Sequence, residues 1–139
     1  MEARIKWVEN AAFTAEAGSG HAIVVDGPPD IGGRNLGVRP MELMLMSVGA
    51  CSAVDIVHIL KKARQPIDDV QVEVKGERAD TEPKVFTAIH LHFIVKGKGL
   101  LANQVERAVK LSAEKYCSAS IMLGRAGAKM THDFEIKEA

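Results

Sequence analysis

Aromatic side chains are scarce in this 139-residue chain, at 4% of its residues, and neither sign of charge is in excess. The 18 Lys and Arg residues balance 18 Asp and Glu, which argues against nucleic acid as a partner because binding to phosphates needs clustered positive charge. Hydrophobic residues make up 47%, too large a share for a disordered chain. We therefore expect a single domain, residues 1–139, with an aliphatic core.

Cysteine is also rare, with only Cys51 and Cys117, too few for a disulfide framework and without the spacing of a zinc motif. The first ten residues are rich in charge and hold no apolar stretch, so no signal peptide is predicted. The longest charge-free apolar run, residues 43–54, is too short to span a bilayer. These features predict a cytoplasmic protein with no membrane partner, whose reduced thiols are either packing residues or redox groups.

Three short strands are predicted near the N-terminus. Residues 3–9 and 13–17 alternate apolar with polar side chains, and residues 21–25 follow a Gly-Ser-Gly turn as a run rich in Ile and Val. Two hairpins in succession predict an antiparallel meander. Residues 26–39 contain four of the twelve glycines and two of the five prolines, and we expect a loop there, of a length that is usually functional or mobile.

A long helix is predicted over residues 40–63, because Pro40 suits a first helical position and Pro66 cannot continue a helix. Apolar residues occupy nearly every angular position of its first five turns, which is typical of a helix buried on all sides. One domain of this size has difficulty enclosing a helix about 36 Å long. We therefore expect a second copy of the chain to cover part of it, in a homodimer.

One stripe of this helix carries reactive side chains. At 100° per residue, Met44, Ser47, Asp55 and His58 share a face with Cys51. Buried polar groups need partners, so this face is predicted to border a cleft or an interface. Two alternatives remain at this point: Cys51 is a small packing residue, or Asp55 and His58 begin the solvent-exposed end of the helix.

The C-terminal half predicts two more strands, residues 69–79 and 85–96, in a hairpin with one polar face that presents His90 and His92. A helix follows over residues 100–116, then a short helix from near Cys117, and a final strand over residues 130–137. Strands and helices in this order indicate an α+β fold.

The residues on these elements are compatible with three kinds of chemistry. A helix N-terminus would lower the pKa of the Cys117 thiol, and two reactive cysteines could act as a peroxidatic and resolving pair. The His90-x-His92 pattern could bind zinc, but no third ligand lies nearby in sequence, so we expect no metal there; His132 and Asp133 would join only through folding. The Gly-rich loop lacks a phosphate-loop pattern, and no cofactor is expected.

The sequence PMELMLMSVGACS, residues 40–52, resembles the Cys-bearing helix motif of the OsmC/Ohr family. The stretch AEKYCS, residues 113–118, resembles the second cysteine motif of that family. The likeness covers essentially the whole chain, and the Arg-x-Lys-Trp-Val start with Ser-Ala-Glu-Lys-Tyr-Cys is most similar to the YhfA-like branch.

This resemblance implies an α+β OsmC-like fold, with antiparallel sheets and a long central Cys-bearing helix in an intertwined homodimer. It also implies a cysteine-based peroxidase that defends against oxidative stress by reducing small organic hydroperoxides, with peroxiredoxin-type chemistry. Cys51 would attack the peroxide and become a sulfenic acid, Cys117 would resolve it to a disulfide, and a dithiol reductant would restore both thiols.

The chain departs from the family pattern at two positions. The hairpin turn at residues 17–20 lacks the Arg that orients the reactive cysteine in efficient peroxidases, and Met41 stands where they carry Glu. We predict that Glu42 and Arg39 assist Cys51, with Arg34 as another source of the cation, and that Met41, Met44, Met46 and Phe86 line a substrate pocket. The alternative is a non-catalytic protein that binds a small apolar ligand at the dimer interface, or a thiol redox sensor.

Overall fold

The computed structural model describes all residues, Met1–Ala139. The chain forms two compact units, Met1–Met44 and Leu45–Ala139, each with its own three-stranded sheet. Every element that the sequence predicts is present.

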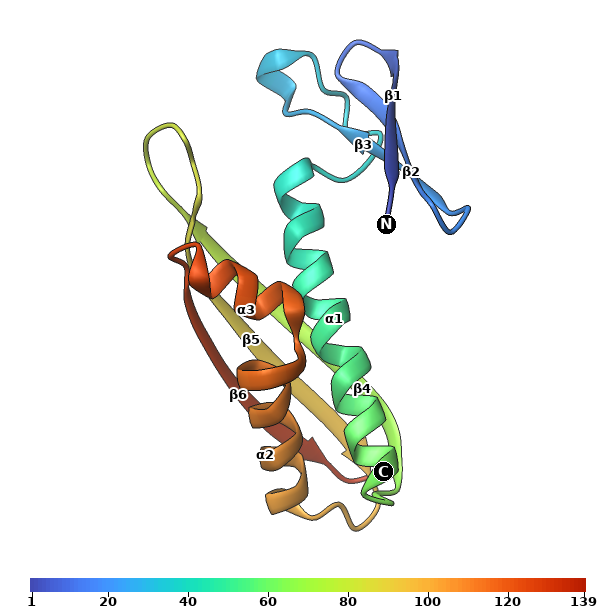
Figure 1. Ribbon diagram of the computed structural model, residues 1–139, viewed down its shortest axis with the longest axis vertical. Coiled ribbons are helices and arrows are strands. Elements are labelled where there is room, and N and C mark those ends of the chain that lie inside the picture. The colour runs from blue at the N-terminus through green and yellow to red at the C-terminus, as the bar shows by residue number, and fades with distance from the viewer. The chain divides into compact units, whose positions relative to one another are not determined.

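The first unit is the predicted antiparallel meander, in the order β1 (Ala3–Glu9), β2 (Ala12–Ala17) and β3 (Ala22–Asp26), seen in blue in Figure 1. The loop after β3 is organised by the buried Asp26, whose Oδ2 accepts the backbone N–H groups of Arg34 (3.0 Å) and Leu36 (3.2 Å). These bonds, above all the one from Arg34, lower the pKa of the Asp26 carboxyl. The loop also contains one 3₁₀ turn, Pro29–Ile31.

Helix α1 (Pro40–Lys62) joins the two units and confirms the predicted long helix. Pro40 is its first residue, and Oε1 of Glu42 accepts the backbone N–H of Arg39 at 2.8 Å, half of a capping box. Residue Arg64, with φ of 56°, turns the chain out of the helix before Pro66.

By length and composition alone α1 could cross a membrane, with a mean hydropathy of 1.9 over its most apolar window. Yet Val48, Ile56 and Leu60 are completely buried within the second unit, as expected of a core helix in a soluble α+β fold. Only 28% of that apolar window is buried. This small share agrees with the expectation that one chain does not enclose the helix.

The second unit contains a mixed sheet of β4 (Ile67–Arg78), β5 (Phe86–Gly97) and β6 (Lys129–Lys137). Strands β4 and β5 are antiparallel as predicted, but β6 runs parallel to β5, so the expectation of antiparallel sheets throughout is wrong. The reason is the long crossover between β5 and β6, which returns the chain to the end where β5 began.

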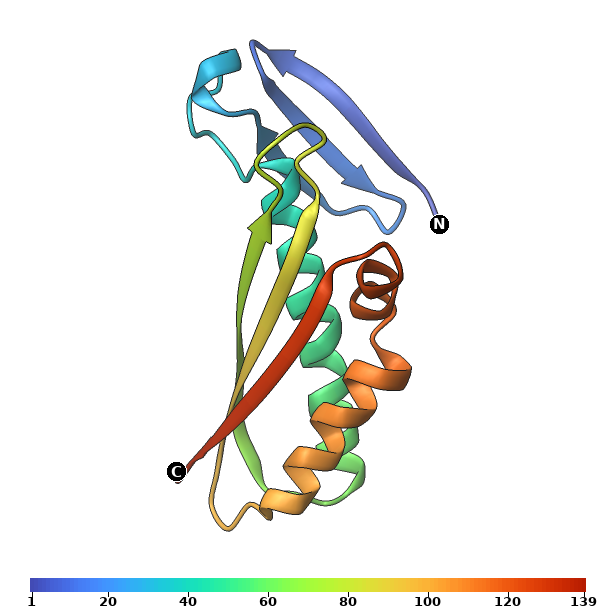
Figure 2. The same cartoon turned by 90° about the vertical axis from the view of Figure 1, so that its left-hand side faces the viewer.

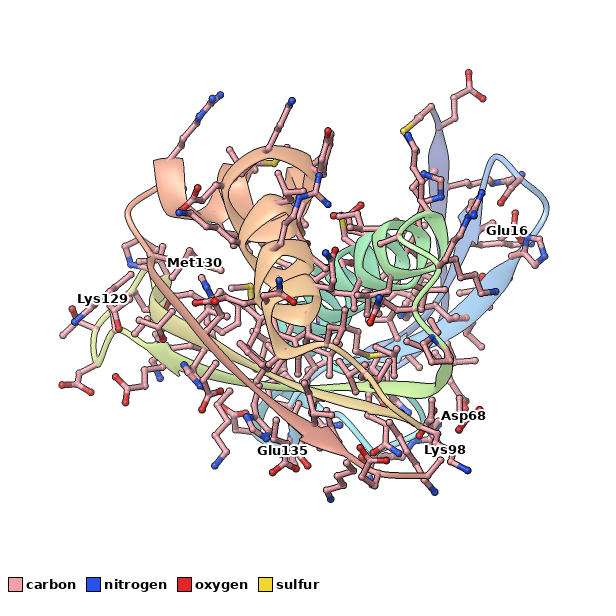
Figure 3. The ribbon with its side chains drawn as sticks, turned by 90° about the horizontal axis from the view of Figure 1, so that it is seen from below. Glu16, Asp68, Lys98, Lys129, Met130 and Glu135 are labelled. Carbon is pink, nitrogen blue, oxygen red and sulfur yellow. The ribbon has the colours of Figure 1, made fainter.

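That crossover consists of α2 (Ala102–Leu111), a π-helical turn, η2 (Ser112–Tyr116), and α3 (Ser118–Arg125). Figures 1 and 2 show that α1, α2 and α3 lie on one face of the sheet. The core fills the space between them, and its fully or almost fully buried members on β5 and α2 are Ile89, Leu91, Phe93, Val95, Val105, Ala108 and Val109. The alternate residues of β5 face the other way, and Figure 3 shows Glu135 of β6 on the side of the sheet away from the helices.

Candidate functional site

The two cysteines, which are far apart in the sequence, meet inside the second unit. Cys51 lies in the middle of α1, and Cys117 is the N-cap residue of α3. Their thiols lie close enough for Cys51 to raise the pKa of the Cys117 thiol. Ser52 Oγ also donates to Cys117 Sγ at 3.1 Å, and the backbone N–H of Ser120 donates to it at 3.4 Å. Folding therefore places the thiols side by side, although their sequence separation gave no indication of it.

The two thiols differ in their access to solvent. Cys117 is completely buried, whereas Cys51 is partly exposed. Burial raises the pKa of the Cys117 thiol, and its contact with Cys51 raises it further, although the bonds from Ser52 and Ser120 lower it. The predicted lowering by the helix N-terminus is present, but the net shift of the Cys117 pKa is upward. The N-terminal N–H of α3 acts in the expected direction, but desolvation of the thiolate outweighs it.

The position of Cys117 is set by the turn that precedes it. The backbone N–H of Cys117 donates to the Ser112 carbonyl at 2.8 Å across the π-helical turn, and Cys117 itself adopts an extended backbone. Single π-helical turns are frequent at functional sites. The hydroxyl of the completely buried Ser112 donates to Asp55 Oδ2 at 3.0 Å, which connects this turn to α1.

Sequence reasoning identified Cys51, Cys117 and Asp55 but missed Ser52 and Ser112. Ser52 lies 100° from Cys51 around the helix axis, so it does not belong to the polar stripe that contains Cys51. Ser112 was placed inside a regular helix, where a serine has no special role. The only indication of these two serines in the sequence is the polar stripe of α1, because its buried polar side chains need hydrogen-bond partners.

The family model described as OsmC-like protein matches residues 32–133, which include both cysteines and their two helices. The chain belongs to the OsmC-like family. Protein YhfA of Escherichia coli is 47% identical to it over 142 residues, and the alignment covers 100% of both chains. The resemblance stated from the sequence, including its branch, is thus confirmed.

Solved structures agree on the OsmC-like fold. A crystal structure of a protein from Aquifex aeolicus is 32% identical, with a TM-score of 0.82, and covers 98% of this chain and 96% of its own. A crystal structure from Legionella pneumophila, described as an organic hydroperoxide resistance protein OsmC and predicted redox protein, has a TM-score of 0.72. It is 20% identical over 97% of each chain, so this second likeness shows the fold alone.

Of the OsmC-like features predicted to assist Cys51, the charged ones lie in the first unit. The guanidinium of Arg39 donates to Asn35 Oδ1 at 3.0 Å and to the Gly37 carbonyl at 3.4 Å, and Arg34 forms an ion pair with Glu9. Glu42 caps α1 through the Arg39 backbone. Each of these groups thus has a local partner, and their assistance to Cys51 stays a prediction.

The predicted substrate-binding residues have different environments. Phe86 is buried within the second unit, 8% exposed, and a Cβ added to Gly76 would lie 2.7 Å from its ring, so the two pack closely. Met41 is half-buried and Met44 is 39% exposed, both in the first turns of α1. Their role in binding a substrate stays a prediction.

A separate apolar groove of about 440 Å³ lies between α1 and β4 in the second unit. Gly49, one of its lining residues, lets α1 approach β4 closely. A Cβ added to Gly49 would lie 2.9 Å from Val74 Cγ2. Its lining is Leu45, Met46, Gly49, Ala50, Ala53, Val72 and Val74. This groove leaves part of the apolar surface of α1 uncovered by its own sheet.

The predicted polar strand face carries a small hydrogen-bonded cluster. Asp133 Oδ1 accepts from His90 Nε2 at 2.9 Å and from His92 Nδ1 at 2.7 Å, because parallel pairing sets β6 beside β5. The bond to Asp133 raises the pKa of His92, and the bond to His92 lowers the pKa of Asp133. No group of three or more His, Cys, Asp or Glu side chains is arranged to hold a metal ion.

Proposed function

We propose that this protein reduces small organic hydroperoxides through the Cys51–Cys117 pair. The observation that carries the proposal is the meeting of the two thiols inside an OsmC-like fold, one partly exposed and the other completely buried. The Legionella neighbour of the same fold, described as an organic hydroperoxide resistance protein, supports the substrate class.

The difference in burial supports the proposed division of roles between the two thiols. A peroxide arriving from solvent reaches Cys51 first, so Cys51 is the attacking thiol. Cys117 is out of reach of a bulky substrate, and its raised pKa keeps it in the protonated form. A buried, protonated thiol next to Cys51 suits the resolving role, because it reacts only after Cys51 has been oxidised.

The proposed reduction of the hydroperoxide has three steps. The Cys51 thiolate attacks the distal peroxide oxygen, the O–O bond breaks, and the alkoxide takes a proton to leave as an alcohol. Cys51 is now a sulfenic acid. The Cys117 sulfur, on losing its proton, attacks Cys51 Sγ, and the sulfenic oxygen leaves as water, so that a disulfide forms. A dithiol reductant exchanges with this disulfide, becomes oxidised itself and restores both thiols.

The chain's own groups assist the second step. Attack by Cys117 requires its thiolate, and the Ser52 hydroxyl and the Ser120 N–H both donate to that sulfur. Each donor stabilises negative charge there and partly offsets the cost of burial. Arg39 and Glu42 are proposed to assist the first step, with Met41, Met44 and Phe86 lining the pocket for the alkyl group of the peroxide.

The proposed functional unit is a cytoplasmic homodimer. Two observations support a second copy as the partner. Only 28% of the most apolar window of α1 is buried, and an apolar groove lies between α1 and β4. Such a partner would remove this apolar surface from water.

The test is to count free thiols after one equivalent of an organic hydroperoxide is added without reductant. We expect wild type to lose both thiols and form one disulfide within the chain, whereas Cys51→Ser keeps Cys117 as a thiol. Cys117→Ser should stop at a Cys51 sulfenic acid that dimedone traps. Retention of both wild-type thiols would reject the proposal.

A thiol redox sensor is the second candidate. Arg34 and Arg39 each have a partner in the first unit, and the turn at residues 17–20, between β2 and β3, lacks the family Arg. A dithiol such as dithiothreitol separates the two functions. A peroxidase consumes many equivalents of hydroperoxide in its presence, whereas a sensor is oxidised once and turns over slowly.

A further inference from the structure

A second cavity, of about 500 Å³, lies between α1 and α2 within the second unit. Its lining includes the polar residues His58 and Lys62 from α1 and Arg107 from α2, the apolar residues Ile59 and Leu111, and Tyr116. An apolar wall with a few converging polar groups is the usual composition of a small-molecule site.

The cationic groups at this cavity have no ionic partner within the chain. Neither Lys62 nor Arg107 forms an ion pair with any carboxylate of the chain. Asp55 is the only acidic group in the lining, and its Oδ2 already accepts the Ser112 hydroxyl. Two cations on different helices thus face one cavity, opposed by a single carboxylate that has its own partner.

From this arrangement we infer that the cavity binds a small amphipathic organic anion. Its carboxylate or phosphate would sit between Arg107, which can donate two parallel N–H bonds to such a group, and the Lys62 ammonium. Its apolar body would lie along Ile59 and Leu111. The cavity is separate from the apolar groove beside β4 and does not include either thiol.

The experiment measures binding to the full-length protein with three eight-carbon probes: octanoate, octyl phosphate and octanol. Calorimetry gives the affinities, and NMR of protein labelled on tyrosine reports the location, because Tyr116 is the only tyrosine in the chain. We expect octanoate or octyl phosphate to shift the Tyr116 resonances and to bind at least tenfold more tightly than octanol. The stronger of the two anions identifies the headgroup that the site prefers.

Variants locate the charge recognition. Arg107→Gln and Lys62→Gln should each weaken binding of the preferred anion about tenfold. Lys61→Gln is the matched control, since it removes the same charge from the adjacent position of α1 and does not line the cavity. It should leave the affinity within twofold of wild type. Cys51→Ser should also bind normally, which separates this site from the proposed thiol chemistry.

Three results would overturn the inference. Equal binding of octanol and both anions would show an apolar pocket without anion recognition. An equal loss in Lys61→Gln and Lys62→Gln would show attraction to the surface charge alone. Lack of any binding by octanoate and octyl phosphate at millimolar concentration would remove the site altogether.

Discussion

The sulfur of Cys117 is completely buried but accepts hydrogen bonds from two donors. Burial raises the pKa of this thiol, while a hydroxyl and a backbone N–H donate to the sulfur and lower it. The balance leaves a thiol that is protonated at rest but has two donors in place for its thiolate. The Ser52 hydroxyl is the donor that mutation can remove.

Ser52→Ala is therefore expected to raise the pKa of the Cys117 thiol further, because the thiolate loses one donor while remaining buried. In a Cys51→Ser background, the ultraviolet absorbance of the thiolate should appear at higher pH than in the parent. Disulfide formation in the protein with both cysteines should slow at any pH below the thiol pKa, because the thiolate fraction falls.

Ser118→Ala is the control for this prediction, since Ser118 is an exposed serine directly after Cys117 and no bond joins it to the sulfur. It should leave the titration unchanged. A titration of Ser52→Ala that coincides with that of the parent would show that the hydroxyl does not stabilise the thiolate.

At the scale of elements, periodicity predicts the strands and helices well, and close packing decides how they meet. The alternation in residues 85–96 predicts one polar face, and the side chains on the opposite face, Ile89, Leu91 and Phe93, are buried. What periodicity could not give was the parallel pairing of β6 with β5, or the close approach of α1 to β4 at Gly49. Both depend on contacts between segments far apart in the chain.

Gly49→Ala tests this close approach. The new Cβ would lie 2.9 Å from Val74 Cγ2, and a β-branched side chain on a strand has little freedom to move aside. Overpacking of this kind costs about 1–3 kcal/mol, more than the roughly 0.5–1 kcal/mol that Ala gains over Gly in a helix. Urea denaturation should show a net loss of unfolding free energy.

Gly124→Ala is the matched substitution in α3, where the new Cβ meets its nearest neighbour, Met130, at an ordinary 3.4 Å. It should be neutral or slightly stabilising by the same measurement, because only the helix propensity changes. Unfolding free energies that shift equally in the two variants would contradict the packing argument.

At the scale of the whole molecule, the main question is what covers the apolar surface of α1. The helix is long and apolar, yet only a small share of its most apolar window is buried. Its exposed apolar side chains include Met46 at 52% and Val54 at 68%. In a member of a soluble family, this surface is better explained by a partner than by solvent.

We expect light scattering to give a mass of about 30 kDa, twice the 15.0 kDa of one chain. Met46→Glu places a charge in the apolar groove beside β4 and should shift the mass toward one chain at low protein concentration. Met122→Glu, at an exposed apolar site on α3 outside that groove, should remain dimeric. Wild type at the mass of one chain at all concentrations would contradict the homodimer.

The sequence by itself determined the α+β composition, the order of elements and their approximate bounds, because hydrophobic periodicity, Pro40 and the turn residues act over a few positions. Through the two cysteine motifs it also determined the family. The tertiary structure decided the contact between Cys51 and Cys117, the buried donors Ser52 and Ser112, and the direction of the Cys117 pKa. Those properties depend on burial and on hydrogen bonds between residues more than fifty positions apart, which no local pattern records.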